Sequence, residues 1–387
     1  MNRVSAFLIS IALIGCTSRR LSDEIIGNVT TIVVDSPSSN KEISVDSLFE
    51  NLTFVRLETN DNCLVASIDQ LVVGKRYLYV FDQMQHALLI FDLKGRFIKK
   101  IVDGRDPQSP VDFHDFVIGE NDEIIVLSYM EILKYTASGE FLERKRFKID
   151  DSYADYVHPI KLSSVGSNYL IWAGSVGRKD LDVRPEYGLF RLAEDFTVLS
   201  KCFLVERELL EIPRFQKFDS RVYIIPYKLK DTIFVADRNN IAASFHIDYG
   251  ENSVSRNSLV RDLRLDESRV VYELSKNTNM CGGTLTFIPI DNFIYFLYDC
   301  GVTRYQAVYS VIGNKVKSGI FYSSRQKPVI YPLTGDGDKL VGFAYPSDLL
   351  SRKHELAAIT SPVTNELLVG LEADENPLIW FGSLRTF

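Results

Sequence analysis

The sequence predicts an all-β fold, a six-bladed β-propeller of four-stranded antiparallel blades with short helical or loop insertions. Runs of β-branched and aromatic residues at 77–82, 88–92 and 96–101 are separated by turns rich in Asp, Gly and Lys, as in consecutive strands of one sheet. The same order of strands and Gly turn returns over residues 123–143, about 45 residues further on, which is the period of propeller blades. Six such blades fill residues 42–387 as one domain.

The N-terminal residues predict a lipoprotein signal peptide over residues 1–15. Arg3 supplies the positive charge, and the apolar stretch 4–14 is shorter than the roughly 20 residues that span a membrane. It ends in Leu-Ile-Gly-Cys at 13–16, which resembles the lipobox of bacterial lipoproteins, so Cys16 is the expected lipidation site. An ordinary secretory peptide that contains a cysteine, and a buried N-terminal strand, are the alternatives.

Residues 16–41 are rich in Ser, Asn and Thr, so they are expected to form a lipidated tether, with an accessory strand as an alternative. Two or more acyl chains on Cys16 would anchor the protein stably to a membrane. No Asp follows Cys16 directly, which would be an inner-membrane retention signal in some bacteria. Asp23 and Glu24 come late compared with the surface-export signal of Bacteroides-like lipoproteins. The expected location is the outer membrane, with the periplasmic or surface face left open.

The remaining elements follow the strand pattern. Residues 48–57 are expected to supply an outer or closing strand, because a propeller closes by joining both chain ends in one blade and so leaves no open sheet edge. The first expected strands of the six blades begin at residues 68, 113, 159, 222, 284 and 339. Residues 206–218 are expected to form a loop or short helix. Residues 258–277 and 348–356 have spacing that favours helices, and residues 378–381 and 384–387 are expected to be the terminal strands.

Composition excludes several classes of protein. The net charge of −7 carries no long single-sign runs, which argues against nucleic-acid binding through a basic face. A hydrophobic content of 46% with 12% aromatic residues supports a large core and argues against a disordered chain.

Four cysteines remain after Cys16, and an envelope protein can oxidise them. Cys281 and Cys300 are the expected pair, because each lies beside a glycine and together they flank a hairpin-sized segment. Buried free thiols are the alternative.

Metal and catalytic motifs are weak. The five histidines never fall at paired ligand spacing, so neither a metal nor a cofactor is expected. Asp112 and His114 have the spacing to orient an imidazole, although a turn cap before the next strand explains them more simply. Gly335–Asp338 reads as a hairpin turn in preference to a calcium loop. No nucleophile elbow or phosphate-binding loop occurs, so the catalytic residues, if any, are unknown.

Four tyrosines fall in expected loops with charges nearby. Exposed aromatic side chains on a propeller rim can stack on glycans or grip peptides, whereas packing in the core is the usual alternative. These candidate ligand-binding residues are Tyr153, Tyr156, Tyr187 and Tyr227.

Several segments together resemble one family, the six-bladed β-propeller lipoproteins of Bacteroides-like bacteria, which are related in pattern to NHL repeats. These segments are residues 54–58, 63–68, 79–82, 90–92, 95–97, 230–235, 245–250 and 376–378. The Gly-Pro-Gly-Glu turn of that family is replaced here by residues 103–110. The resemblance implies the fold and leaves the chemistry open.

The expected function is that of a cell-envelope binding module for a protein, peptide or glycan, rather than an enzyme. One alternative is an NHL-like hydrolase or lyase with a site in the axial channel. Another is a structural partner in an outer-membrane transport or polysaccharide-handling complex.

Overall fold

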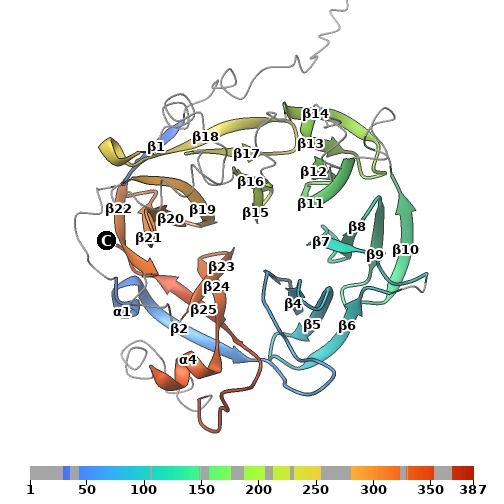
Figure 1. Ribbon diagram of the computed structural model, residues 1–387, viewed down its shortest axis with the longest axis horizontal. Coiled ribbons are helices and arrows are strands. Elements are labelled where there is room, and N and C mark those ends of the chain that lie inside the picture. The colour runs from blue at the N-terminus through green and yellow to red at the C-terminus, as the bar shows by residue number, and fades with distance from the viewer. Residues whose placement is uncertain are drawn as a thin grey trace, which may run out of the picture.

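Six sheets, antiparallel apart from one added strand, surround a central axis in the computed structural model (Figure 1), which confirms the predicted six-bladed β-propeller. The residues described are 29–34, 43–104, 107–147, 149, 157–175, 187–204, 212–226, 231–253, 280–322, 328, 330–352 and 368–387. Within these ranges, no helix is both long enough and apolar enough to cross a membrane.

The first three blades follow the chain in order. Blade one contains β3 (Gln70–Val73), β4 (Tyr77–Asp82), β5 (Ala87–Asp92) and β6 (Phe97–Val102). Blade two contains β7 (Phe113–Ile118), β8 (Ile124–Ser128), β9 (Glu131–Tyr135) and β10 (Phe141–Arg146). Blade three contains β11 (Val157–Val165), β12 (Asn168–Ser175), β13 (Tyr187–Leu192) and β14 (Val198–Leu204).

The last three blades complete the ring. Blade four contains β15 (Arg214–Phe218), β16 (Arg221–Ile225), β17 (Thr232–Ala236), β18 (Ile241–Asp248) and a fifth strand, β1 (Thr30–Val33). Blade five contains β19 (Cys281–Ile290), β20 (Phe293–Cys300), β21 (Thr303–Ser310) and β22 (Lys315–Tyr322). Blade six contains β23 (Tyr331–Asp336), β24 (Lys339–Ala344), β25 (Leu378–Leu384) and β2 (Phe49–Arg56). The short helices are α1 (Val45–Leu48), η2 (Gly250–Asn252) and α4 (Pro346–Ser351).

The ring is closed in blade six, where β2 from the N-terminal part of the chain pairs antiparallel with β25 from the C-terminal part. Phe54 lies opposite Trp380 in this pair. Trp380 is fully buried, and its Nε1 donates a hydrogen bond to the carbonyl oxygen of Phe343 at 3.0 Å. The expectation that residues 48–57 close the ring is therefore confirmed.

Most of the aromatic residues belong to the core between neighbouring blades. Phe81 of blade one contacts Phe113 of blade two with ring centroids 4.7 Å apart, and Tyr79 contacts Phe116 at 6.5 Å. Such pairs add to the free energy gained by burying the rings. The flat faces of adjacent blades are thus held together by aromatic side chains from their strands.

Three boundaries differ from the expectations. Residues 214–218 form β15, the inner strand of blade four, although 206–218 was expected to be a loop or short helix. Blade six begins at Tyr331 rather than at residue 339. Gly335–Asp338 form the end of β23 and the turn into β24, so the hairpin turn expected there is confirmed. The final strand ends at Leu384, so residues 385–387 are not a strand.

Strand β1 lies inside the segment 16–41, which was expected to be a tether or, as the alternative, to contain an accessory strand, and the structure shows such a strand. It pairs parallel with β18 at the outer edge of blade four. Ile32 and Val34 are buried there, with 1% and 3% of their surface exposed. The propeller therefore reaches further toward the N-terminus than the expected boundary at residue 42.

Candidate functional site

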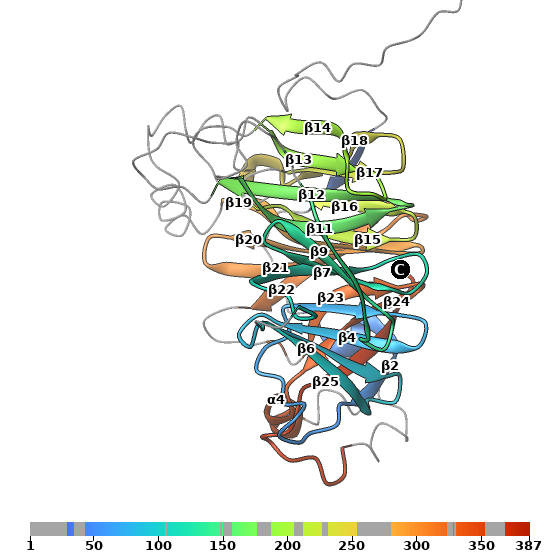
Figure 2. The same ribbon diagram turned by 90° about the vertical axis from the view of Figure 1, so that its right-hand side faces the viewer.

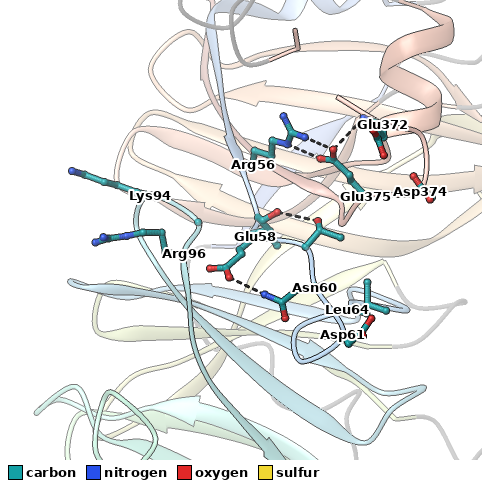
Figure 3. A pocket seen from close by; sticks show the side chains of 13 residues that line it. Arg56, Glu58, Asn60, Asp61, Leu64, Lys94, Arg96, Glu372, Asp374 and Glu375 are labelled. Carbon is teal, nitrogen blue, oxygen red and sulfur yellow. Dashed lines mark hydrogen bonds and ion pairs between the residues drawn. The ribbon is translucent and has the colours of Figure 1, made fainter. Parts of the chain in front are cut away.

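A pocket of about 640 Å³ opens at the seam between blade six and blade one (Figure 3). Its lining comes from the end of β2 and the loop after it, the turn between β5 and β6, and the loop before β25. We call it the seam pocket; its lining residues are Arg56, Leu57, Glu58, Thr59, Asn60, Asp61, Leu64, Lys94, Gly95, Arg96, Glu372, Asp374 and Glu375.

Arg56 and Glu375 form an ion pair between the N-terminal and C-terminal parts of the chain at one wall of the seam pocket. The guanidinium of Arg56 donates to both carboxylate oxygens of Glu375, with Nε 2.5 Å from Oε2. Arg56 Nη2 also donates to the carbonyl oxygen of Gly370 at 3.1 Å. Paired contacts between a guanidinium and a carboxylate are strong and directional. Both side chains are therefore held in place before any ligand arrives.

Glu58 connects this wall to the β5–β6 turn. Its backbone N–H donates to the carbonyl oxygen of Gly95 at 2.8 Å, and its Oε2 accepts a hydrogen bond from the Phe97 N–H at 2.9 Å. Gly95 has a φ of +83°, and a Cβ there would lie 2.0 Å from the Arg56 carbonyl oxygen. Only glycine permits this close approach of the β5–β6 turn to the end of β2.

Asp92 fixes the conformation of the β5–β6 turn. Its Oδ1 accepts hydrogen bonds from the N–H groups of Lys94 and Arg96, both at 2.9 Å, and its Oδ2 lies 2.7 Å from Arg96 Nε. Partial burial acts to raise the pKa of Asp92, but the hydrogen bonds from Arg96 and Lys94 outweigh it and lower the pKa. The turn thus presents two cationic side chains at the rim of the seam pocket.

Asn376 holds the two loops together behind the seam pocket. Its buried amide donates to the carbonyl oxygens of Glu58 at 2.7 Å and Cys63 at 2.8 Å, and its Oδ1 accepts a hydrogen bond from the Val65 N–H at 2.8 Å. Its own N–H donates to Thr59 Oγ1 at 3.0 Å. Its amide hydrogen bonds are thus made within the protein, which is typical of a positioning residue.

The charges of the seam pocket are separated in space. Figure 3 shows Lys94 and Arg96 on one side of Glu58, and Glu372, Asp374 and Glu375 on the other. Glu375 is neutralised by Arg56 and Arg96 by Asp92. Within the part of the chain that the structure describes, the carboxylates of Asp61, Glu372 and Asp374 have no ion-pair partner, and neither does the Lys94 ammonium. These exposed charges are available to a ligand.

Of the four tyrosines named from the sequence, the structure describes only the backbone of one. Tyr153, Tyr156 and Tyr227 lie outside the described residues, as does Cys16. The backbone of Tyr187 belongs to β13, opposite Leu204 of β14, and its side chain is not among those described. The residues around the seam pocket contain no catalytic motif. Residues 54–58, 95–97 and 376–378 were among the segments that carried the family resemblance. The local sequence feature that pointed to a constrained turn here was Gly95, three residues after Asp92.

Cys281 and Cys300, the pair named from the sequence, are joined by a disulfide in the structure. They lie opposite each other in the β19–β20 pair, with Cα atoms 4.1 Å apart. The bond ties the open end of this hairpin in blade five. Cys63 is buried as a thiol, with its Sγ 3.1 Å from the Glu58 carbonyl oxygen.

Polar groups around the axis mainly contact one another. Asp115 of β7 is buried and accepts a hydrogen bond from the Leu162 N–H at 2.9 Å; burial raises its pKa, opposed by Lys161. Lys217 of β15 donates to Ser164 Oγ at 2.7 Å, and enclosure by the surrounding strands lowers its pKa although part of the residue is exposed. Gln216 Nε2 donates to Thr334 Oγ1 of blade six at 3.0 Å. These contacts tie the inner strands together.

The other polar motifs form no larger cluster. His114 Nε2 lies 3.4 Å from Asp112 Oδ2 at the start of blade two. In the described ranges, no three His, Cys, Asp or Glu side chains come together in a way that could hold a metal ion.

The model of a protein family matches residues 29–383, and the family is described as a domain of unknown function, DUF4934. This chain belongs to the DUF4934 family. The match begins one residue before β1 and ends within β25, so the fifth strand of blade four and both sides of the seam lie inside the family's extent. No curated protein matches the chain.

Two solved structures share the fold. A Bacteroides fragilis protein described as exported aligns with 92% of this chain and 100% of its own, with a TM-score of 0.72 and 16% identity. A member of the DUF4221 family from Bacteroides vulgatus aligns with 87% of this chain and 97% of its own, with a TM-score of 0.51 and 10% identity. At these identities the likeness shows the propeller fold alone.

Proposed function

We propose that this DUF4934 chain is a lipid-anchored binding module of the cell envelope, and that it binds a peptide segment with basic side chains in the seam pocket. The observation that carries the proposal is the seam pocket itself, in which charged side chains that have no ion-pair partner among the described residues lie on loops fixed by hydrogen bonds. Its volume of about 640 Å³ lies within the range of small-ligand sites. The lipobox at Cys16 and the exported Bacteroides fragilis neighbour support an envelope location.

The chemistry of the lining favours a peptide. Asp61, Glu372 and Asp374 offer carboxylates to the ammonium or guanidinium of a Lys or Arg side chain, and Lys94 offers a cation to a carboxylate of the same ligand. The lining contains no aromatic side chain, so it lacks the stacking surface that favours glycans. A peptide that carries both charges matches this separation.

The scaffold reduces the cost of binding. Arg56, Glu58 and Asn376 fix both loops by hydrogen bonds, so the pocket does not have to be assembled when the ligand binds. Preorganised sites retain more of their interaction free energy as affinity. Because the ligand-facing charges are exposed, each contact is expected to be modest and sensitive to salt.

Isothermal titration calorimetry with short Lys-Ala peptides that have a free carboxylate tests the pocket. Binding that weakens with added salt is expected, and the double variant Asp61→Asn, Asp374→Asn should lose it. Glu50→Gln is the matched control, because Glu50 is exposed on β2 away from the seam pocket. Equal binding by the double variant, or by an all-acidic peptide, would contradict the proposal.

The anchor is tested separately. Cells fed an alkyne fatty acid should incorporate it into the wild-type protein, and Cys16→Ser should lose both the label and the membrane fraction. A wild-type protein without label, or a labelled Cys16→Ser variant, would reject lipidation at Cys16.

A further inference from the structure

Strand β1 fastens the N-terminal segment to the outer edge of blade four. Thr30 to Val33 pair in parallel with Phe245 to Asp248, and the Val34 N–H donates to the Asp248 carbonyl oxygen at 2.8 Å. Ile32 and Val34 pack into the core between blades four and five, beside residues such as Ile247 and Tyr249. Val33 points outward, with 58% of its surface exposed. The strand is thus held by its own apolar side chains.

The docking of β1 decides where the chain leaves the propeller. The thirteen residue-to-residue steps from Cys16 to Val29 span at most about 45 Å in any conformation. If β1 were undocked, the first packed residue would be Ile43, at the start of the segment that leads into β2. The span from Cys16 to Ile43 would then be 27 residue-to-residue steps and at most about 95 Å.

The two exit points lie on blades two places apart in the ring of six, because β1 belongs to blade four and β2 to blade six. Blade one, which forms the other side of the seam pocket, lies three places from blade four and so across the axis from it. In Figures 1 and 2, β18 lies at the top and β2, β25 and β6 lie toward the bottom. The end of β2 at Arg56 is itself part of the seam pocket. Without β1, the chain would enter at blade six, the blade that contributes to the pocket.

We infer that β1 is a latch that holds the outer edge of blade four toward the lipid bilayer and so turns the seam pocket away from the membrane. The inference rests on the proposed lipid anchor at Cys16. A pocket facing away from the bilayer is accessible to a soluble peptide or to a segment of another envelope protein. The β1 latch therefore sets the working orientation of the binding site.

Fluorescence energy transfer to a rhodamine-labelled lipid tests this orientation. The mature chain, beginning at Cys16, is coupled by its thiol to maleimide lipid in phosphatidylcholine vesicles. Cys202→Ser prevents coupling at that thiol, whereas Cys63 is fully buried. Donor dyes are placed through azido amino acids at Glu251, an exposed residue just after β18, or at Lys94 on the rim of the seam pocket.

Transfer from position 251 is expected to exceed transfer from position 94. In the double variant Ile32→Asp, Val34→Asp this difference should disappear, because the docked strand is lost. Val33→Asp is the matched control and should keep the difference, since Val33 is exposed. Circular dichroism checks that each variant retains its ring.

Two results would overturn the latch. One is equal or greater transfer from position 94 in the wild-type sequence, which requires no variant to fold. The other is an unchanged difference after β1 has been undocked. Because the anchor is supplied chemically, a failure of natural lipidation at Cys16 would not affect either measurement.

Discussion

Two carboxyl groups, one near the seam pocket in blade one and one in blade four, are stabilised in opposite protonation states. Asp82 at the end of β4 is fully buried and accepts hydrogen bonds from Ala66 N–H at 2.6 Å, Ser67 Oγ at 3.1 Å and Gln85 Nε2 at 2.6 Å. Burial acts to raise its pKa, but these donors and two further N–H groups outweigh burial and lower the pKa. The seam region thus stabilises the ionised carboxylate.

Asp231, directly before β17, has fewer donors. Ser253 Oγ donates to its Oδ2 at 3.2 Å and the Gly283 N–H also acts to lower its pKa, whereas its buried Oδ1 has no hydrogen-bond partner among the described residues. Burial, together with the nearby Asp248, raises the pKa of Asp231 to about 7. The number of hydrogen-bond donors, rather than burial alone, therefore decides whether a blade stabilises the ionised or the protonated form of a carboxyl group.

The largest effect is expected from Asp82→Asn. An amide cannot accept the same set of hydrogen bonds, so buried N–H groups of the 64–67 loop would lose their partner, at a cost of about 4 kcal/mol in the free energy of unfolding at pH 7. Asp69→Asn is the control, since Asp69 is exposed and bonds Ser67 Oγ and the Gln83 N–H. Urea denaturation measures both variants.

The effect of Asp82→Asn should also depend on pH in one direction. A carboxyl group whose pKa is lowered by folding stabilises the protein above its ordinary value of 3.8, and this stabilisation is lost as the pH falls below it. The gap between wild type and variant should therefore narrow in acid. A gap that is constant with pH would show that the charge of Asp82 is not what the donors stabilise.

The next largest effect is expected from Gly95→Ala, which should lower the free energy of unfolding by about 3 kcal/mol. The added Cβ would meet the Arg56 carbonyl oxygen, and φ at this position is +83°. Gly337→Ala separates the two causes, because its φ is +57° and nothing lies within 4 Å of the added atom, so only the backbone cost of about 1 kcal/mol applies. Equal losses in thermal or urea unfolding would mean that the β2 and β5–β6 segments are free to move apart at the seam.

The sequence predicted the blades because each repeats strands and turns that are local in the chain. It missed β15 because Arg214, Gln216 and Lys217 make the strand polar, and their role becomes visible only when the inner strands meet around the axis, as in the contact of Gln216 with Thr334. An accessory strand within 16–41 was one alternative, but its partner could not be predicted, because β1 is short and pairs with residues more than 200 positions away.

The seam pocket could not be predicted for a related reason. Its lining joins residues 56–64, 94–96 and 372–375, and only the closure of the ring brings these segments together. In the sequence alone, each of these charged residues is indistinguishable from an ordinary solvated surface residue. The pairing of Arg56 with Glu375 depends on the register of β2 against β25, which the amino-acid pattern does not specify.

At blade four the pH dependence should have the opposite sign. With a pKa of about 7 in the folded state and 3.8 in the unfolded chain, Asp231 holds a proton only in the folded protein between these pH values. The free energy of unfolding should thus fall by about 2 kcal/mol as the pH rises from 4 to 7, less than the unscreened shift would give. Asp231→Asn should remove this fall, and a variant that retains it would assign the dependence to another group.

The smallest effect is expected from Ile32→Ala in β1. Burial of Ile32 resembles that of a core residue, for which truncation costs about 2–5 kcal/mol. However, β1 is an added fifth strand on blade four, and the ring is closed without it by β2 and β25. The strand can therefore detach before the ring unfolds, so the global loss should be only about 1 kcal/mol.

Hydrogen exchange distinguishes detachment of β1 from global unfolding. In Ile32→Ala, the amides of residues 30–34 and their partners in β18 should exchange faster, while amides of β2 and β25 keep the wild-type rate. Val33→Ala should leave both sets unchanged, because the Val33 side chain is exposed. Faster exchange at both places in Ile32→Ala would mean that β1 belongs to the same cooperative unit as the ring closure, and the latch would then be part of the structural core of the propeller rather than a separable orienting strand.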